Sequence, residues 1–284
     1  MIFISSRADR YLLEPITAQI GTTDPRYLVV LGDRRETMQA AWEAFQKGTP
    51  VVHIHGGERT PCSLDDIHRD CITRMSVLHF PPTKEAAERI YQINPSATVI
   101  RCGAIGAELA TNMVPIPRAD LPFRIEGKTW LVTWHPQPGE DIGELIEALQ
   151  EQGGDVIWTY PNADPGHEAV LSKIHGAGYE PHVDLTMPVY LSLMHYATAV
   201  VGNSSSGLIE APSIGAQTIN IGNRQTGRPQ ASSVTSIACK KADIYAALHL
   251  TNYMPVFPKI NPYYKPGTID TIVREVRARW PSQS

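Results

Sequence analysis

Apolar strands that alternate with amphipathic helices constrain this chain more than any other feature of its sequence. Strands are predicted at Ile2–Ser5 and Tyr27–Leu31, and a helix at about Tyr11–Ile20 lies between them. The helix after the second strand carries apolar residues at helical spacing, namely Met38, Ala41, Trp42 and Phe45. Continuous apolar strands joined by helices form parallel sheets that are covered on both faces and bind ligands at the carboxyl ends of their strands. We therefore expect an α/β fold in which the polar residues that follow strands are the candidate site residues.

A proline-rich segment divides the predicted fold into two domains. The periodicity lapses between Val114 and Lys128, where three prolines accumulate, and this composition is typical of a linker. The alternation resumes with four predicted strands: Trp130–Trp134, Asp155–Tyr160, Thr198–Val201 and Gln217–Ile221. We predict α/β domains at residues 1–116 and 117–284, and a closing helix at about Thr268–Arg279 is a candidate to return to the first domain.

Composition excludes several classes of protein. The 284 residues are 42% hydrophobic and 19% charged, which indicates a globular chain. A net charge of −4 argues against a general nucleic-acid binder, which needs a basic surface. The four cysteines form no metal-ligand or disulfide pattern, so we expect a reducing cytoplasm. The first apolar run is too short for a signal peptide, and no segment approaches the ~20 apolar residues of a membrane span, so a soluble, unanchored protein is expected.

The segment Gly202–Pro212 places three serines and two glycines between a strand and an acidic helix start. If Ser206 caps that helix, free backbone N–H groups and the positive end of the helix dipole point at the turn that contains Ser204 and Ser205, and phosphate is a natural ligand there. A capped loop without a ligand explains the same residues equally well.

Other polar residues follow strands and extend this hypothesis. Arg224 and Arg228 lie in the turn after the next strand, and their planar guanidinium groups match phosphate. Arg7 follows the first predicted strand and is either a second phosphate ligand or part of a surface salt bridge. Asn162 and Asp164 follow another strand and either bind a base or ribose or form a turn.

Carboxylates end two strands of the first domain. Asp33 and Glu58 each follow a strand beside glycine, which lets a ligand approach the backbone closely. Asp65 and Arg69 are four residues apart and could form a salt bridge on one helical face, although an acid at such a position can also simply cap a helix. His135 ends a strand of the second domain, and its ordinary pKa suits proton transfer near neutrality, although a lone histidine is usually structural. None of the histidines has metal-site spacing, so we assign no metal.

Several motifs together resemble the hydrolysing UDP-N-acetylglucosamine 2-epimerases, in order and over nearly the whole chain. They are Leu31–Arg34, His53–Glu58, Asp65–Arg69 with Ile72 and Thr73, Leu78–Phe80, His135–Pro136, Gly202–Pro212 and Asn220–Arg228. The resemblance implies a glycosyltransferase B-type fold, in which two Rossmann-like domains hold a nucleotide sugar in the cleft between them, with no metal or nicotinamide cofactor. A homodimer or higher homo-oligomer is the default expectation for such an enzyme.

The resemblance also implies roles for the candidate residues. The proton-transfer carboxylates would be Asp33, Glu58 and Asp65, while His135 and Arg69 would support the departing diphosphate or the acid step. UDP would be held by Arg7, Ser204, Ser205, Ser206 and Glu210, with Glu210 accepting hydrogen bonds from the ribose hydroxyls. The expected reaction converts UDP-N-acetylglucosamine and water to N-acetylmannosamine and UDP through a glycal.

The sequence departs from the family pattern chiefly in its first domain. Further strand and helix units normally precede the Gly-Asp-Arg strand, whereas here Ile20 leads almost directly to Tyr27. The lost units normally form a sheet edge and part of the sugar pocket, so a partner subunit could cover that edge. Smaller departures are Ser5-Ser6-Arg7 in place of Gly-Thr-Arg, and Asp70 where a histidine is common. A sugar transferase of the same fold with an acceptor other than water, or a non-catalytic nucleotide-sugar binder, is the alternative.

Overall fold

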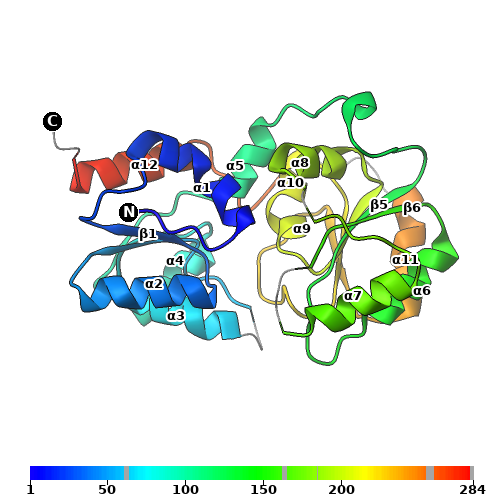
Figure 1. Ribbon diagram of the computed structural model, residues 1–284, viewed down its shortest axis with the longest axis horizontal. Coiled ribbons are helices and arrows are strands. Elements are labelled where there is room, and N and C mark those ends of the chain that lie inside the picture. Colours follow the sequence, from blue (N-terminus) through cyan, green and yellow to red (C-terminus); the bar gives the residue numbers. More distant parts are fainter. Residues whose placement is uncertain (61–63, 162–164, 184, 254–258, 282–284) are drawn as a thin grey trace. The chain divides into compact units, whose positions relative to one another are not determined.

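The computed structural model describes residues 1–60, 64–161, 165–183, 185–253 and 259–281, without the side chains of Arg7 and Asn252. The chain divides into two compact units (Figure 1). The first unit combines Met1–Glu108 with Tyr263–Ser284, and the second unit is Leu109–Pro262.

The first unit contains a parallel four-stranded sheet in the order β1-β2-β3-β4. Its strands are β1 (Leu28–Leu31), β2 (Val51–Ile54), β3 (Ser76–Phe80) and β4 (Thr98–Val99). Its helices are α1 (Arg7–Ile20), α2 (Arg35–Gln46), α3 (Leu64–Met75), α4 (Lys84–Ile93), α12 (Thr268–Arg279) and the first part of α5 (Ile105–Asn112). Buried Val30 and Val51 pack with Ala41 of α2 and Ile72 of α3 on one face of the sheet. Figure 1 shows α1 and α12 side by side over the other face.

The strand predicted at Ile2–Ser5 is wrong, because Ile2 forms only a single parallel bridge to Val29. Ser6 caps α1 by accepting a hydrogen bond from the backbone N–H of Asp9 (3.1 Å), so the chain enters the helix before a longer ladder can form. The backbone N–H of Phe3 still donates to Val29 O (2.9 Å), and the N–H of Val29 donates to Met1 O (2.8 Å). The first residues of the chain therefore cover the outer edge of β1.

Helix α12 is tied to the first unit at both of its ends. The two carboxylate oxygens of Glu108 accept hydrogen bonds from the backbone N–H groups of Gly267 (2.7 Å) and Ile269 (2.8 Å), which caps the start of the helix. At the other end, the ring centroids of Trp280 and Tyr27 lie 4.9 Å apart. The last helix thus completes a unit that begins at the opposite end of the chain.

The second unit contains a parallel five-stranded sheet in the order β6-β5-β7-β8-β9. Its strands are β5 (Thr129–Thr133), β6 (Asp155–Trp158), β7 (Ala199–Gly202), β8 (Thr218–Ile221) and β9 (Val234–Ile237). Its α-helices are α6 (Ile142–Gln152), α7 (His167–Gly176), α8 (Met187–Tyr196), α9 (Ser206–Ile209), α10 (Ala211–Ile214) and α11 (Lys241–Leu250), and the short 3-10 helices are η1 (Arg118–Asp120) and η2 (Thr251–Tyr253).

Side chains alternate between the two faces of this second sheet. Trp130 and Val132 of β5 pack in the core with α6, α7 and α11, whereas Leu131 packs with α8 and α10 on the opposite face. The proline-rich segment predicted to be a linker packs on the same face as Leu131, because Leu121 and Ile125 are buried there. The divide between the units instead falls within α5, between Glu108 and Leu109.

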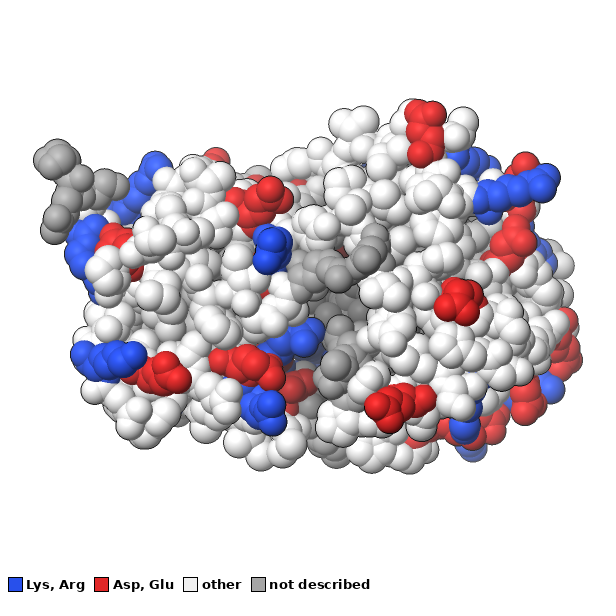
Figure 2. Space-filling model, in the orientation of Figure 1, with Lys and Arg blue, Asp and Glu red and all other residues white. Residues whose placement is uncertain are grey.

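The surface of the protein carries charges of both signs. Figure 2 shows acidic and basic side chains interspersed on the visible face, so the described residues there form no continuous basic surface of the kind that binds nucleic acid. None of the described helices is both long enough and apolar enough to cross a bilayer.

Candidate functional site

The turn that carries Glu58 is held tightly against α4. Glu58 follows β2 and is 8% exposed. Gly57 has a φ of +80°, and a Cβ atom at this position would lie 2.1 Å from Ala86 O, so only glycine fits. The sequence-based inference that glycine lets the backbone turn sharply beside this carboxylate is therefore correct at Gly57.

Arg69 joins the residues that follow β1 and β2. Its fully buried guanidinium group donates to Glu58 O (2.7 Å), to Asp66 Oδ1 (2.6 Å) and to Thr60 Oγ1 (3.0 Å), and it forms an ion pair with Asp33. Burial alone would lower the pKa of Arg69, but the carboxylates of Asp33, Glu58 and Asp66 raise it. The arginine is therefore a fixed positive charge that holds two carboxylates and the backbone of Glu58 from three segments of the first unit.

A second guanidinium group supports the same turn. Arg89 of α4 donates to Glu58 O (2.7 Å) and to Asp70 Oδ2 (2.8 Å), and it lies 3.5 Å from Asp66 Oδ2. Burial raises the pKa of Asp70, although Arg89 acts in the opposite direction. Asp70, the residue that departs from the family pattern, therefore has an arginine partner that holds the backbone of Glu58.

Two buried histidines, His53 and His79, lie near these charged groups in β2 and β3. Nε2 of His53 donates to Gly32 O (2.8 Å), directly before Asp33, and Nδ1 of His53 is 3.3 Å from Thr73 Oγ1. Burial, and then the nearby His79, lower the pKa of His53 to about 3. Burial likewise lowers the pKa of His79 to about 4. Because its pKa is this low, His53 is suited to holding the turn before Asp33 in place and not to exchanging protons near neutrality.

In the second unit, three adjacent strands end beside one another. The register pairs Thr133 of β5 with Gly202 of β7, and Gly202 with Asn220 of β8. His135 follows β5, the serines follow β7 and the two arginines follow β8. All of them therefore lie at the carboxyl end of the sheet. This arrangement agrees with the expectation that polar residues collect at the carboxyl ends of parallel strands.

Ser206 does not cap the helix as predicted. Ser206 is the first residue of the four-residue helix α9, and the N-cap residue, Ser205, makes no side-chain cap bond. The Ser206 hydroxyl instead contacts Tyr190 Oη (2.7 Å) and donates to Ser204 Oγ (3.0 Å). Tyr190 of α8 thus holds the hydroxyl of Ser206, which in turn holds that of Ser204.

The turn after β8 joins the turn after β7 through Asn203. Arg224 Nη1 (3.2 Å) and Gln225 Nε2 (2.8 Å) both donate to Asn203 O. Arg228 Nη1 donates to Gln225 Oε1 (2.9 Å). Both predicted arginines therefore belong to one hydrogen-bonded group with the residue that precedes the serines.

The remaining predicted residues are placed as follows. Glu210 is 9% exposed at the junction of α9 and α10. Asp65 lies in the first turn of α3. Arg7 is the first residue of α1, but its side chain is not described, and Asn162 and Asp164 lie outside the described residues.

The sequence reasoning missed several polar residues of both units that are buried or partly buried: Asp66, Arg89, Asn203, Gln225 and Tyr190. Asn203 had a usable signal, because it directly follows a strand in a segment already selected. Arg89 and Tyr190 had none, since polar residues on amphipathic helices ordinarily face solvent. Among the described residues, no group of three His, Cys, Asp or Glu side chains could hold a metal ion.

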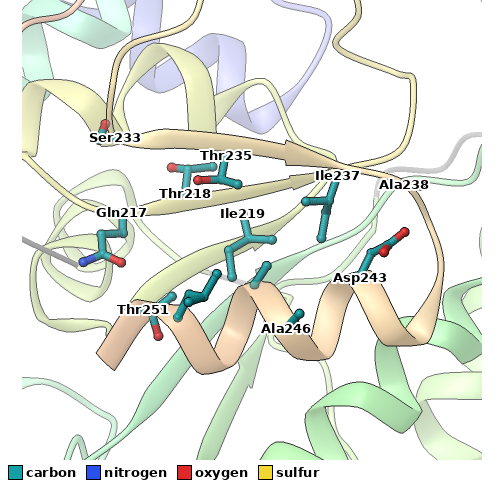
Figure 3. A pocket seen from close by; sticks show the side chains of 12 residues that line it. Gln217, Thr218, Ile219, Ser233, Thr235, Ile237, Ala238, Asp243, Ala246 and Thr251 are labelled. Atoms are coloured by element: carbon teal, nitrogen blue, oxygen red, sulfur yellow. The ribbon is translucent and has the colours of Figure 1, made fainter. Parts of the chain in front are cut away.

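A cavity of about 260 Å³ lies elsewhere in the second unit, between α11 and the strands β8 and β9 (Figure 3). Ile219, Ala247 and Leu250 contribute apolar walls, and Gln217 Oε1 and Ser233 Oγ are buried there without a hydrogen-bond partner. The lining contains none of the predicted site residues, so this cavity is separate from the strand-end group.

The two covered parallel sheets define a protein of the glycosyltransferase B type, and similarity to solved structures shows the same fold. The UDP-GlcNAc 2-epimerase of Methanocaldococcus jannaschii, in complex with UDP-GlcNAc and UDP, matches with a TM-score of 0.76 and 16% identity, over 97% of this chain and 82% of that one. Residues 10–277 match the family model described as UDP-N-acetylglucosamine 2-epimerase, and the chain belongs to this family.

Two relatives show the degree of similarity within the family. The polysialic acid biosynthesis protein P7 of Escherichia coli is 31% identical over 270 residues, which cover 88% of this chain and 69% of the relative. The GDP/UDP-N,N'-diacetylbacillosamine 2-epimerase (hydrolyzing) of Campylobacter jejuni is 31% identical over 228 residues, which cover 74% of this chain and 59% of that enzyme. The chain thus spans between 59% and 69% of the length of these relatives.

Proposed function

We propose that the protein is a hydrolysing nucleotide-sugar 2-epimerase that converts UDP-N-acetylglucosamine and water to N-acetylmannosamine and UDP. The observation that carries the proposal is the buried Arg69, which gathers Asp33, Asp66 and the Glu58 turn around one fixed positive charge. Desolvating charges is costly, so a set of carboxylates held by one buried arginine supports a catalytic role for this group. Family membership and the relatives named as hydrolyzing 2-epimerases support the reaction type.

The chemistry assigns proton transfer to the first unit. The bond from C1 to the diphosphate oxygen breaks with its electron pair leaving on UDP, while a carboxylate removes the proton from C2, so that a glycal with a C1–C2 double bond forms. Water then adds its hydroxyl group to C1, and C2 receives a proton on the opposite face, which inverts this carbon. We assign the two proton transfers to Asp33, Glu58 and Asp65 as a set, with Arg69 fixing Asp33 and the backbone of Glu58.

UDP binding is assigned to the second unit. Ser204, Ser205 and Ser206 and the guanidinium groups of Arg224 and Arg228 offer donors that match a diphosphate. Glu210 is proposed to accept hydrogen bonds from the ribose hydroxyls, and His135 is proposed to stabilise the departing diphosphate. Arg7, Asn162 and Asp164 remain proposed ligands on the strength of the sequence.

The direct test is incubation of the protein with UDP-N-acetylglucosamine while UDP and free sugar are followed by mass spectrometry. Release of UDP together with N-acetylmannosamine is expected, and Asp33→Asn and Glu58→Gln should each lower kcat by at least about 100-fold. Asp24→Asn is the matched control, because Asp24 also pairs with an arginine of the first unit, Arg26, outside the site. UDP release that depends on an added sugar acceptor would replace hydrolysis with transfer.

The same assay should include UDP-N,N'-diacetylbacillosamine, because two relatives are named for epimerising this sugar. The sugar with the higher kcat/KM identifies the substrate. No UDP release from either sugar at high protein concentration would overturn the proposal.

A further inference from the structure

Asn203 joins the end of β7 to the end of β5 by hydrogen bonds that imitate a strand. Its side chain is fully buried. Asn203 Oδ1 accepts from the backbone N–H of His135 (2.7 Å), and Asn203 Nδ2 donates to His135 O (2.8 Å). The backbone N–H of Asn203 donates to Thr133 O (3.2 Å). The amide therefore continues the pairing of the two strands past the point where their backbones separate, at the position of His135.

The backbone of the same residue holds the end of β8. Asn203 O accepts from Gln225 Nε2 and from Arg224 Nη1. Gln225 is also fully buried, so the carbonyl oxygen of Asn203 is held between two donors, of which one is buried. One residue thus sets the positions of three predicted site elements, which are His135, Arg224 and the serines that follow Asn203 in the chain.

We propose that Asn203 is a positioning residue, which sets the placement of His135 and Arg224 for diphosphate departure. The proposal rests on the proposed function. An asparagine amide is suited to this role because it supplies one acceptor and one donor, matched to the N–H and C=O of a single residue. Aspartate, which has the same shape, cannot donate when ionised, and alanine offers neither group.

The test compares N203D and N203A with the wild-type enzyme. A displacement of about 1 Å at a reacting group can cost ~100-fold in rate, so we expect N203A to lower kcat by about that factor at every pH. In N203D the ionised carboxylate faces His135 O without a donor, whereas its protonated form restores the donor. The activity of N203D relative to wild type should therefore rise as the pH is lowered, while that of N203A stays flat.

Ser192→Ala is the matched control for loss of stability. Ser192 is fully buried in the same unit, and its hydroxyl also makes two bonds to backbone groups, accepting from the N–H of Ile116 (2.9 Å) and donating to Pro188 O (2.6 Å). S192A should lower Tm and leave kcat and its pH profile unchanged. If N203A and N203D behave like S192A, Asn203 is merely structural and the proposal is wrong.

Two further measurements separate this proposal from the reaction itself. Calorimetry should show weaker UDP binding by N203A, because the backbone carbonyl that Arg224 contacts is then no longer held by the side-chain bonds to His135. The ring resonances of His135 in a two-dimensional NMR spectrum should shift in N203A and not in S192A. If the wild-type protein turns over no nucleotide sugar, the proposed function fails, while these two measurements still support or overturn the positioning role.

Discussion

Arg69 holds several segments of the first unit together through one buried side chain. Its guanidinium group is 1% exposed, while Asp33 and Asp66 retain 25% and 23% exposure. Removing the arginine would leave two carboxylates and the carbonyl group of Glu58 without their shared donor. Breaking a buried ion pair from one side costs more than the pair contributes, because the remaining charge stays desolvated.

Arg69→Met should therefore lower the free energy of unfolding by roughly 3–5 kcal/mol, measured by urea denaturation near neutral pH. The control is Arg124→Met, which removes an arginine that is 81% exposed and paired with an exposed Glu126. This control should leave the free energy of unfolding near the wild-type value. Equal effects of the two substitutions would show that the contacts of Arg69 contribute little.

Strand ends were enough to select Asp33 and Glu58 from the sequence, and helical spacing pointed to Arg69. The contact partners could not be predicted, because which acid of the pair Asp65 and Asp66 meets Arg69 within α3 depends on the rotation of the helix about its axis. Asp66 contacts Arg69 three residues before it. The position of Asn203 directly after a strand was a usable signal, but its bonds to His135 could not be predicted, since nothing in a sequence shows that an amide is buried against a distant backbone.

Among the elements, β7 ends at a residue where a side chain larger than that of glycine does not fit. Gly202 has a φ of +130°, and a Cβ atom there would lie 2.0 Å from Thr133 O of the neighbouring strand. Gly202→Ala should thus force β5 and β7 apart at the residue where Asn203 and the serines begin. We expect a loss of roughly 2–4 kcal/mol in the free energy of unfolding and of measurable UDP binding.

Gly176→Ala provides the comparison, because Gly176 is helical and a Cβ atom there meets nothing within 4 Å. This substitution should leave UDP binding intact and stabilise the protein by up to about 1 kcal/mol. The two variants are compared by thermal denaturation and by titration with UDP. Normal UDP affinity in G202A would contradict the close approach of the two strands.

Most elements of the fold were predictable because their strands are continuous apolar runs between helices. The exceptions have physical causes. β4 has two residues, and β9 lies at a sheet edge with half-exposed side chains, so neither gives a continuous apolar signal. The short helices α9 and α10 meet at Glu210, where the sequence suggested one longer helix.

For the molecule as a whole, His53 and His79 predict how stability changes with pH. Burial lowers the pKa of these residues to about 3 and about 4, whereas their ordinary value is 6.5. Between these values the unfolded chain binds protons that the folded chain does not. Stability is therefore complete above about pH 6.5 and falls as the pH is lowered, by up to about 1.4 kcal/mol per pH unit for each histidine.

His79→Gln should reduce this slope by about 1.4 kcal/mol per pH unit between pH 6 and pH 5, measured as unfolding free energy in urea. The comparison of slopes removes any constant cost of the substitution itself. His175→Gln is the control for the loss of an imidazole group, since His175 is 48% exposed in the second unit. A full slope in H79Q would show that His79 already binds a proton in the folded protein.

The first unit is assembled from both ends of the chain, and this has a consequence for its biosynthesis. The ribosome completes Met1–Glu108 early, but α12, which packs against α1 and is capped by Glu108, emerges only after all of Leu109–Pro262. At ordinary rates of translation this delay is on the order of 10 s. During that time the part of α1 that packs against α12 has no partner, whereas the second unit can finish folding as soon as it leaves the ribosome. The nascent first unit is therefore the part of the protein that a chaperone would need to hold.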